Sequence, residues 1–185
     1  MKDGRGVTPR LFLIKTRTGG IRMGKIIMGI DPGASGALCC VSDQKVVEIF
    51  DMPVYEVIKS GKKRKRLNPC GLISILKNTH IDHAFVEEVN AMPKNGITAA
   101  FTFGWMCAGL ETALVACEVP FTYVRPQEWK KAMKCPRDKD ESRMRATQLM
   151  PSNAELWRLK KHDGRAEAAM IGLYGEKITK GEITL

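Results

Sequence analysis

Apolar residues first gather in three short runs, at Lys25–Ile30, Gly36–Val41 and Val46–Phe50. Residues 31–35 separate the first two runs, and residues 42–45 separate the second from the third; both links are rich in residues that favour turns. Links this short cannot carry a crossover connection. The pattern therefore predicts an antiparallel meander of three strands.

Strand and helix periods then alternate. Helical spacing over Pro69–Thr79 precedes a strand at His83–Glu87. A long apolar helix is predicted from an N-cap at Thr98 to Cys117, followed by a strand at Pro120–Val124. Three helices follow, at Pro126–Met133, about Asp140–Met150 and about Gly164–Tyr174.

The resulting order of elements is β-β-β-α-β-α-β-α-α-α. A helix between two strands normally returns the chain parallel to the strand it left. We therefore predict an α/β sandwich around a five-stranded mixed sheet, with three meander strands and two parallel strands. The long helix is apolar on most sides, so we expect it to be buried.

The 185 residues, 44% of them apolar, suit one domain with a sizeable core. Its six cysteines form no C-x-x-C pair and no zinc-type cluster with histidine, which favours a reduced, cytoplasmic protein. The longest uncharged stretch, Gly96–Leu110, is shorter than the roughly 18 residues of a membrane span. We expect no membrane partner.

The net charge of +10 indicates a polyanionic partner. Half of this excess lies in residues 1–24, which hold six basic residues and one acid. We interpret residues 1–22 as a disordered leader, or as an extension ahead of a start at Met23, and residues 23–185 as the domain. The densest basic cluster in the domain spans Lys62–Arg66, which we expect to form a loop.

Two predicted strands end in a carboxylate, the first in Asp31 and the fourth in Glu87. If these strands are parallel neighbours, both acids emerge at the edge where open α/β sheets place their sites. Two carboxylates at one place repel each other and need a cation, and hard cations such as Mg²⁺ prefer oxygen ligands.

A third element adds two more acids. Asp163 and Glu167 are four residues apart, so on a helix they share one face. The small residues around them allow this helix to pack close to the sheet. Four carboxylates could hold two metal ions, which together activate water and stabilise both oxygens of an in-line phosphoryl displacement.

Each acid also has a structural interpretation. Asp31 could simply start a turn, without any role in a site, and Asp163 could simply cap the last helix. Glu167 could be a solvated acid paired with Arg165 or Lys160, and Glu88 competes with Glu87 because adjacent strand residues face opposite ways. The joint occurrence of these acids on the expected elements favours a site.

Residues from about Met23 to Tyr174 resemble the RuvC-type Holliday-junction resolvases, most of all the compact bacteriophage versions. The resemblance rests on four segments in order: Gly29–Ala37 (GIDPGASGA), Phe85–Glu88 (FVEE), Pro126–Lys131 (PQEWKK) and Lys161–Ala169 (KHDGRAEAA).

This resemblance implies a ribonuclease H-like fold and endonuclease activity on branched DNA, namely four-way junctions and also three-way junctions and forks. It implies two Mg²⁺ or Mn²⁺ ions per active site, held by Asp31, Glu87, Asp163 and Glu167, in the cytoplasm of a bacterium or a phage-infected cell. In the family pattern the last two ligands are three residues apart. Here Asp163 and Glu167 are four apart, and Gly164 stands three residues before Glu167. His162 is therefore the alternative to Asp163.

Family members are homodimers, so the resemblance implies two active sites that nick opposed strands. The helix Thr98–Cys117 is the candidate interface, with a buried core helix as the alternative.

Basic and aromatic side chains suggest where DNA would lie. Phosphate contacts are expected from Lys62, Lys63, Arg64, Lys65 and Arg66, with a solvated loop as the alternative, and from Lys94, Lys130 and Lys131 near the catalytic edge. Phe101, Phe103 and Trp105 could stack on opened bases or belong to the core. We expect Trp129 and Trp157 to be packing residues.

Two rival functions share some of these features. A sugar-kinase or actin-like nucleotide binder also has Asp-x-Gly-x-x-Gly after a strand, but its two domains exceed 185 residues. A junction binder without catalysis, or an RNA-processing nuclease of the same fold, is the second rival. The intact acids argue against loss of catalysis but do not distinguish DNA from RNA.

Overall fold

A computed structural model describes residues 24–59, 61–89 and 96–184 of the chain. The expected leader at residues 1–22 and Lys94 lie outside the described residues, as does the side chain of Lys62.

The main sheet has the predicted composition. Its strands are β1 (Ile27–Asp31), β2 (Ala37–Ser42), β3 (Lys45–Asp51), β6 (His83–Glu87) and β7 (Phe121–Val124), in the spatial order β3-β2-β1-β6-β7. The first three form an antiparallel meander, and β6 and β7 run parallel to β1. The prediction of a five-stranded mixed sheet is confirmed.

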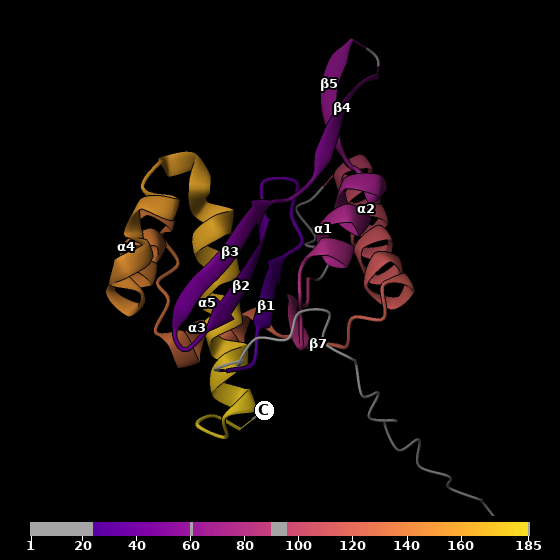
Figure 1. Cartoon of the computed structure of the whole chain (residues 1–185). Coiled ribbons are helices and arrows are strands. Elements are labelled where there is room, and N and C mark those ends of the chain that lie inside the picture. The colour runs from indigo at the N-terminus through magenta and orange to yellow at the C-terminus, as the bar shows by residue number, and fades with distance from the viewer. Residues whose placement is uncertain (1–23, 60, 90–95, 185) are drawn as a thin grey trace, which may run out of the picture.

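Helices cover both faces of this sheet (Figure 1). One face carries α1 and α2, and the other carries α3, α4 and α5. Their bounds are α1 Pro69–Asn78, α2 Ile97–Ala116, α3 Pro126–Met133, α4 Lys139–Leu149 and α5 Asp163–Thr179, with short 3₁₀ helices at Pro151–Trp157 and Lys160–His162.

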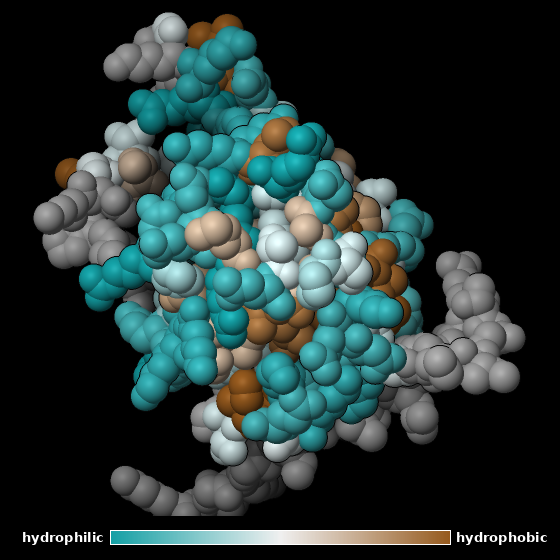
Figure 2. Space-filling model, turned by 90° about the vertical axis from the view of Figure 1, so that its left-hand side faces the viewer, coloured by the Kyte–Doolittle hydropathy of each residue, from teal (hydrophilic) through white to brown (hydrophobic). Residues whose placement is uncertain are grey.

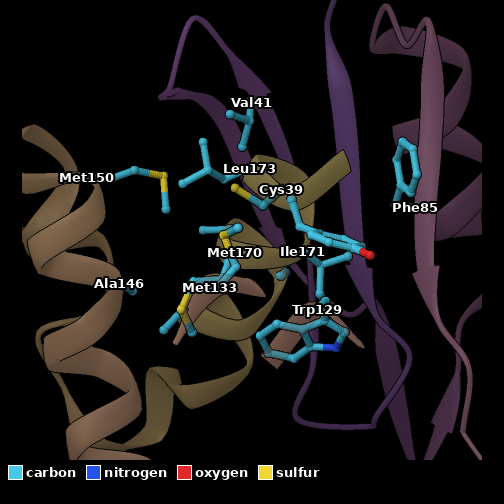
Figure 3. Packing of buried hydrophobic residues seen from close by; sticks show 14 of the residues in the cluster. Cys39, Val41, Phe85, Trp129, Met133, Ala146, Met150, Met170, Ile171 and Leu173 are labelled. Carbon is cyan, nitrogen blue, oxygen red and sulfur yellow. The ribbon is translucent and has the colours of Figure 1, made fainter. Parts of the chain in front are cut away.

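Strand alternation divides the apolar side chains between two cores. Ile27 and Phe85 point to the α5 side, whereas Met28 and Val86 point to the α1–α2 side. Figure 3 shows the first core, where the buried Trp129 of α3 lies among side chains of the sheet and of α5. Trp129 and Trp157 are both buried, which confirms that they are packing residues.

Local signals explain where several helices begin. The side chain of Asn68 accepts a hydrogen bond from the Gly71 N–H, and Pro69 is the first residue of α1. Asp138 caps α4 by accepting the N–H groups of Asp140 and Glu141. These caps satisfy backbone donors that a helix start leaves without intrahelical partners.

The expected basic loop is instead a β-hairpin, so that prediction is wrong. Strands β4 (Val54–Lys59) and β5 (Lys62–Leu67) pair antiparallel in a sheet of their own, which projects from the body (Figure 1). Gly61 at its tip has φ +72°, a conformation that glycine adopts without steric cost. The Lys-Lys-Arg-Lys-Arg sequence has no apolar alternation, which hid the strand.

The long helix α2 is buried on one side only, so the expectation of full burial is wrong. Met106, Leu110 and Leu114 enter the core, but Ile97 is 90% exposed and Val115 is 63% exposed. By length and composition alone this helix could cross a membrane. Its core face, packed against α1 and the sheet, instead identifies it as part of a globular domain.

Helix α5 lies against the sheet with backbone next to backbone. A Cβ atom built on Gly29 of β1 would lie 2.1 Å from the Ala168 carbonyl oxygen and 2.1 Å from the Gly172 nitrogen. A Cβ atom on Gly175 would lie 2.1 Å from the Phe85 ring, and one on Gly164 would lie 2.3 Å from the Ser35 carbonyl oxygen. The close packing expected from small residues is confirmed.

Replacing Gly29 tests this packing. We expect Gly29→Ala to destabilise the protein by about 3 kcal/mol or more, because the added methyl meets backbone that cannot move without displacing α5. Chemical denaturation would measure the loss. Gly104→Ala in α2 is the control: its methyl enters open space, so stability should rise by up to about 1 kcal/mol. Equal effects of the two substitutions would contradict the close packing.

Candidate active site

The carboxylates of Asp31 and Glu87 stand on neighbouring strand ends. In the parallel pair β1–β6, Ile30 lies beside Val86, and each acid is the next residue along its strand. Alternate residues of a strand point to the same face of the sheet. Asp31 therefore points to the same face as Ile27, and Glu87 to the same face as Phe85, which is the face that α5 covers. The sequence expectation that these two acids share one sheet edge agrees with this geometry.

A tight turn fixes Asp31. The Gly33 N–H donates to Asp31 Oδ1 at 3.2 Å, and the Gly36 N–H donates to the Gly33 carbonyl at 2.8 Å. Asp31 thus starts a turn, as its structural interpretation held, but it also faces charged neighbours. Burial raises its pKa to about 7; the Glu167 and Glu87 carboxylates also raise it, while the Gly33 N–H and Lys130 lower it.

The buried Glu87 carboxylate, 9% exposed, is oriented by an indole. Trp129 Nε1 of α3 donates to Glu87 Oε1 at 3.0 Å. Burial raises the pKa of Glu87; the Trp129 hydrogen bond opposes this rise, and the Glu167 carboxylate adds to it. Its neighbour Glu88, whose side chain is 44% exposed, pairs instead with Arg125, with 3.6 Å between Glu88 Oε2 and Arg125 Nε. The geometry therefore favours Glu87 over Glu88.

Glu167 brings a third carboxylate from α5. Lys130 Nζ donates to Glu167 Oε1 at 3.1 Å, so the partner is neither Arg165 nor Lys160. Burial alone would lower the pKa of Lys130, but the carboxylates of Glu167 and Glu87 raise it above its usual value. One ammonium group therefore acts on three carboxylates, since it also lowers the pKa of Asp31.

Asp163 is paired with two cations of α4. Arg143 Nη1 donates to Asp163 Oδ1, and Lys139 Nζ lies 3.3 Å from Asp163 Oδ2. Asp163 is the first residue of α5 and does not cap it; the cap position belongs to His162, whose side chain makes no capping bond. His162 Nδ1 is buried without a hydrogen-bond partner among the described residues.

Two clefts flank the acids. The larger, of about 490 Å³, is lined by Asp31, Asp163 and Glu167, by His162, and by lysines at its margin that include Lys65. The smaller, of about 290 Å³, is lined by Glu87 with Glu88 and the Tyr123 ring. Asp163 and Glu167 thus share one face of α5, as their spacing predicted.

The donor chemistry of this site suits a hard divalent cation. Asp31, Glu87 and Glu167 offer only oxygen ligands, and burial, together with repulsion from the neighbouring carboxylates, raises the pKa of Asp31 and Glu87. Within the described residues, no three acidic, histidine or cysteine side chains stand as an assembled metal site. The ammonium of Lys130 instead supplies the positive charge beside Glu167. The residue types suit such a cation. For Glu167 to bind it, Lys130 would have to release the Glu167 carboxylate.

The residues expected to bind DNA are unequally placed. Lys130 lies within the acidic cluster, whereas Lys131 is exposed and lines neither cleft. Lys63 and Arg64 are exposed on the hairpin, where Lys63 pairs with Glu56 at 3.1 Å. The side that carries α3, α4 and α5 is mostly hydrophilic, with the hairpin above it (Figure 2).

Sequence reasoning missed the residues that hold the acids in place. Trp129, Arg143 and Lys139 each contact a predicted site carboxylate. Arg165 makes a two-point contact with Asp51 at the end of β3, with distances of 2.6 and 2.7 Å. Trp129 and Arg165 lie in the PQEWKK and KHDGRAEAA segments, whereas Arg143 and Lys139 lie outside the four segments and had no such signal.

No protein-family model and no curated protein matches the sequence. Solved structures do match. RuvC of T. thermophilus in complex with a Holliday junction substrate superposes with a TM-score of 0.56 at 17% identity, covering 85% of this chain and 96% of that chain.

Two further structures are similar to a lower degree. Another T. thermophilus RuvC structure has a TM-score of 0.49 at 18% identity, covering 84% of this chain and 96% of that one. The fowlpox virus Holliday junction resolvase has a TM-score of 0.42 at 12% identity, covering 83% and 99%. The first comparison shows the fold: the chain has the ribonuclease H-like architecture of RuvC.

The burial of Asp31 makes stability depend on pH. A carboxyl whose pKa rises from 3.8 to about 7 on folding does not lower the free energy of unfolding below about pH 4. It lowers that free energy increasingly as pH rises toward 7. In EDTA, Asp31→Asn should therefore raise the free energy of unfolding at pH 8, by up to about 4 kcal/mol, with the gain vanishing near pH 4. Denaturant titrations across this range would measure it.

Glu155→Gln on the exposed 3₁₀ helix is the control and should show no such gain. Equal stability of Asp31→Asn and the unmodified protein at pH 8 would show that Asp31 carries no buried charge.

Proposed function

We propose that this protein is a structure-selective endonuclease that hydrolyses phosphodiester bonds at Holliday junctions and related branched DNA. The observation that carries the proposal is the convergence of Asp31, Glu87 and Glu167 from β1, β6 and α5, with the pKa of Asp31 raised to about 7. The RuvC fold and the four sequence segments support it. Branched DNA as the substrate follows from that resemblance.

The site would use Mg²⁺ or Mn²⁺, with two ions per active site. Asp31, Glu87 and Glu167 are the proposed ligands, joined by Asp163 or by His162, which lines the same cleft as Asp31 and whose buried Nδ1 has no hydrogen-bond partner in the part of the chain that the structure describes. Such ions supply Lewis acidity and an activated water for in-line attack at phosphorus.

The chain's own residues prepare this chemistry. Trp129 fixes the orientation of Glu87, because its indole N–H can only donate. Arg143 and Lys139 hold Asp163 at the cleft margin until a stronger cation competes for it. Lys130, once it leaves Glu167, is placed to donate to a non-bridging oxygen of the scissile phosphate.

DNA would approach along the basic strand β5 of the hairpin. Lys62 to Arg66 supply phosphate contacts that hold the duplex without reading its sequence, with Lys94 and Lys131 as further contacts. Lys65, at the margin of the larger cleft, links these contacts to the acids.

The active form would be a homodimer, as the resemblance implies. The C-terminal half of α2 is the proposed interface, because Ala108, Thr112 and Val115 form an exposed stripe of small and apolar residues. The N-terminal half lies beside the basic hairpin, whose charges would repel those of a second copy.

The catalytic proposal predicts metal-dependent cutting of branched DNA. Purified protein with Mg²⁺ should cut four-way or three-way junctions but not linear duplex, and EDTA should abolish cutting. Asp31→Asn and Glu87→Gln should each slow cutting about a thousandfold or more while junction binding persists, because several kcal/mol of transition-state stabilisation are lost. Gel assays of cleavage and of binding would measure both.

Glu88→Gln is the matched control, since it removes the same charge one residue away and should leave cutting within about twofold. Absence of cutting on every branched substrate, with binding intact, would favour a binder without catalysis. Loss of binding in Asp31→Asn would make Asp31 structural.

The dimer proposal predicts that Val115→Glu yields a monomer, because two copies would bring buried carboxylates face to face. Sedimentation would report the mass, and a cruciform plasmid would report whether paired nicks become single nicks. Glu111→Gln, on the neighbouring exposed position, should leave the mass unchanged. A monomeric unmodified protein that still nicks both strands together would exclude the interface.

A further inference from the structure

The β4–β5 hairpin stands between two different surfaces. Its strands form a sheet separate from the main one, and it projects beyond the layers of the domain (Figure 1). Successive residues of a strand point to opposite faces. Consecutive cations of β5 therefore point to the two opposite faces of the hairpin.

One side belongs to the catalytic cleft. Lys65 lines the larger cleft together with Asp31 and Glu167, and with Met52 and Val54 at the base of the hairpin. Lys65 is exposed, so its ammonium is available to a phosphate of a strand that enters this cleft.

The other side faces the start of α2. The Arg66 guanidinium lies over the Trp105 ring, 4.3 Å from its centroid. Trp105 is 49% exposed and Phe101 is 73% exposed. These two aromatic residues are four apart on α2 and share one helix face. Within the described residues, they form an aromatic surface beside a cation on the hairpin side away from the acids.

We propose that the β4–β5 hairpin is a strand-separating pin, which enters the branch point and sends the two strands to different surfaces. This inference rests on the proposed function and extends it. The strand to be cut would follow Lys65 into the cleft. The displaced strand would follow Arg66 onto α2, where an unpaired base would stack on Trp105 or Phe101.

The energetics favour this division. Opening a base pair at a branch costs less than within a duplex arm, because stacking is already interrupted there. An aromatic ring that receives the freed base returns part of the cost, and stacking tolerates any base. Arg66 already lies on the ring, so its guanidinium can bind the phosphate next to the stacked base. Cations on both strand paths favour nucleic acid over a second copy of this basic chain.

Photo-cross-linking can test the pin directly. The full chain carrying Asp31→Asn would be bound, in EDTA, to a four-way junction with 5-iododeoxyuridine either at the branch point or well inside one arm. We expect a cross-link at Trp105 or Phe101 from the branch position only. The doubly substituted protein Trp105→Ala, Phe101→Ala should lose it, and Trp105→Phe should keep it.

Affinity gives a second readout. Trp105→Ala should weaken junction binding about tenfold while duplex binding stays unchanged, because the duplex offers no unpaired base. Lys65→Gln should lower the slope of log affinity against log salt by about one, as loss of one phosphate contact requires. Lys45→Gln, at the opposite end of the sheet, removes the same charge and should leave the slope unchanged.

Several outcomes would overturn the pin. Cross-links that form equally in the arm, or that survive the double substitution, would show that the aromatic surface does not receive the branch. A change of mass on Trp105→Ala would assign that surface to a second copy of the chain. Because these measurements use uncut DNA without metal, their failure is separate from a failure to cleave.

Discussion

The contact on which this site depends is the backbone approach of α5 to β1. Gly29 on the strand faces Ala168 and Gly172 on the helix, and a single added methyl at Gly29 would meet backbone atoms at 2.1 Å. Side chains ordinarily separate packed layers, by about 10 Å between two stacked sheets. Here glycine and alanine remove that separation. The helix therefore delivers Glu167 to the strand end where Asp31 stands, and interaction between their charges follows from the packing.

Such packing stores an electrostatic cost in the fold. Burial and neighbouring carboxylates raise the pKa of Asp31 and Glu87, and the chain offsets part of this cost with one indole N–H and one ammonium. Both come from α3, as Trp129 and Lys130. Adjacent helix residues point about 100° apart, so one short helix can touch Glu87 with one side chain and Glu167 with the next. The core helix α3 thereby orients two of the acids.

The sequence predicted the main sheet, five helices and the sheet edge that Asp31 and Glu87 share, because these features depend on local periods. It did not predict the hairpin, since cations on both faces of β5 leave no apolar alternation, nor the exposed stripe on α2, since that helix is apolar all round. It also missed the partners of Asp163. Arg143 lies 20 residues away, and only the fold of α4 against α5 brings the two together. Contacts set by tertiary packing leave no periodic trace.

Topology explains why the hairpin belongs to the site. In the meander, Asp31 pairs with Ala37, and Ala37 pairs with Asp51, so β1 and β3 end at the same edge of the sheet. Any segment inserted after β3 must therefore leave the domain beside the carboxylates. The Arg165 fork fixes Asp51 to α5 at that edge, which ties the base of the hairpin to the helix that carries Glu167. A polyanion bound along the hairpin would thus be held next to the acids. A cation between the polyanion and the carboxylates would offset the repulsion between these two negative groups.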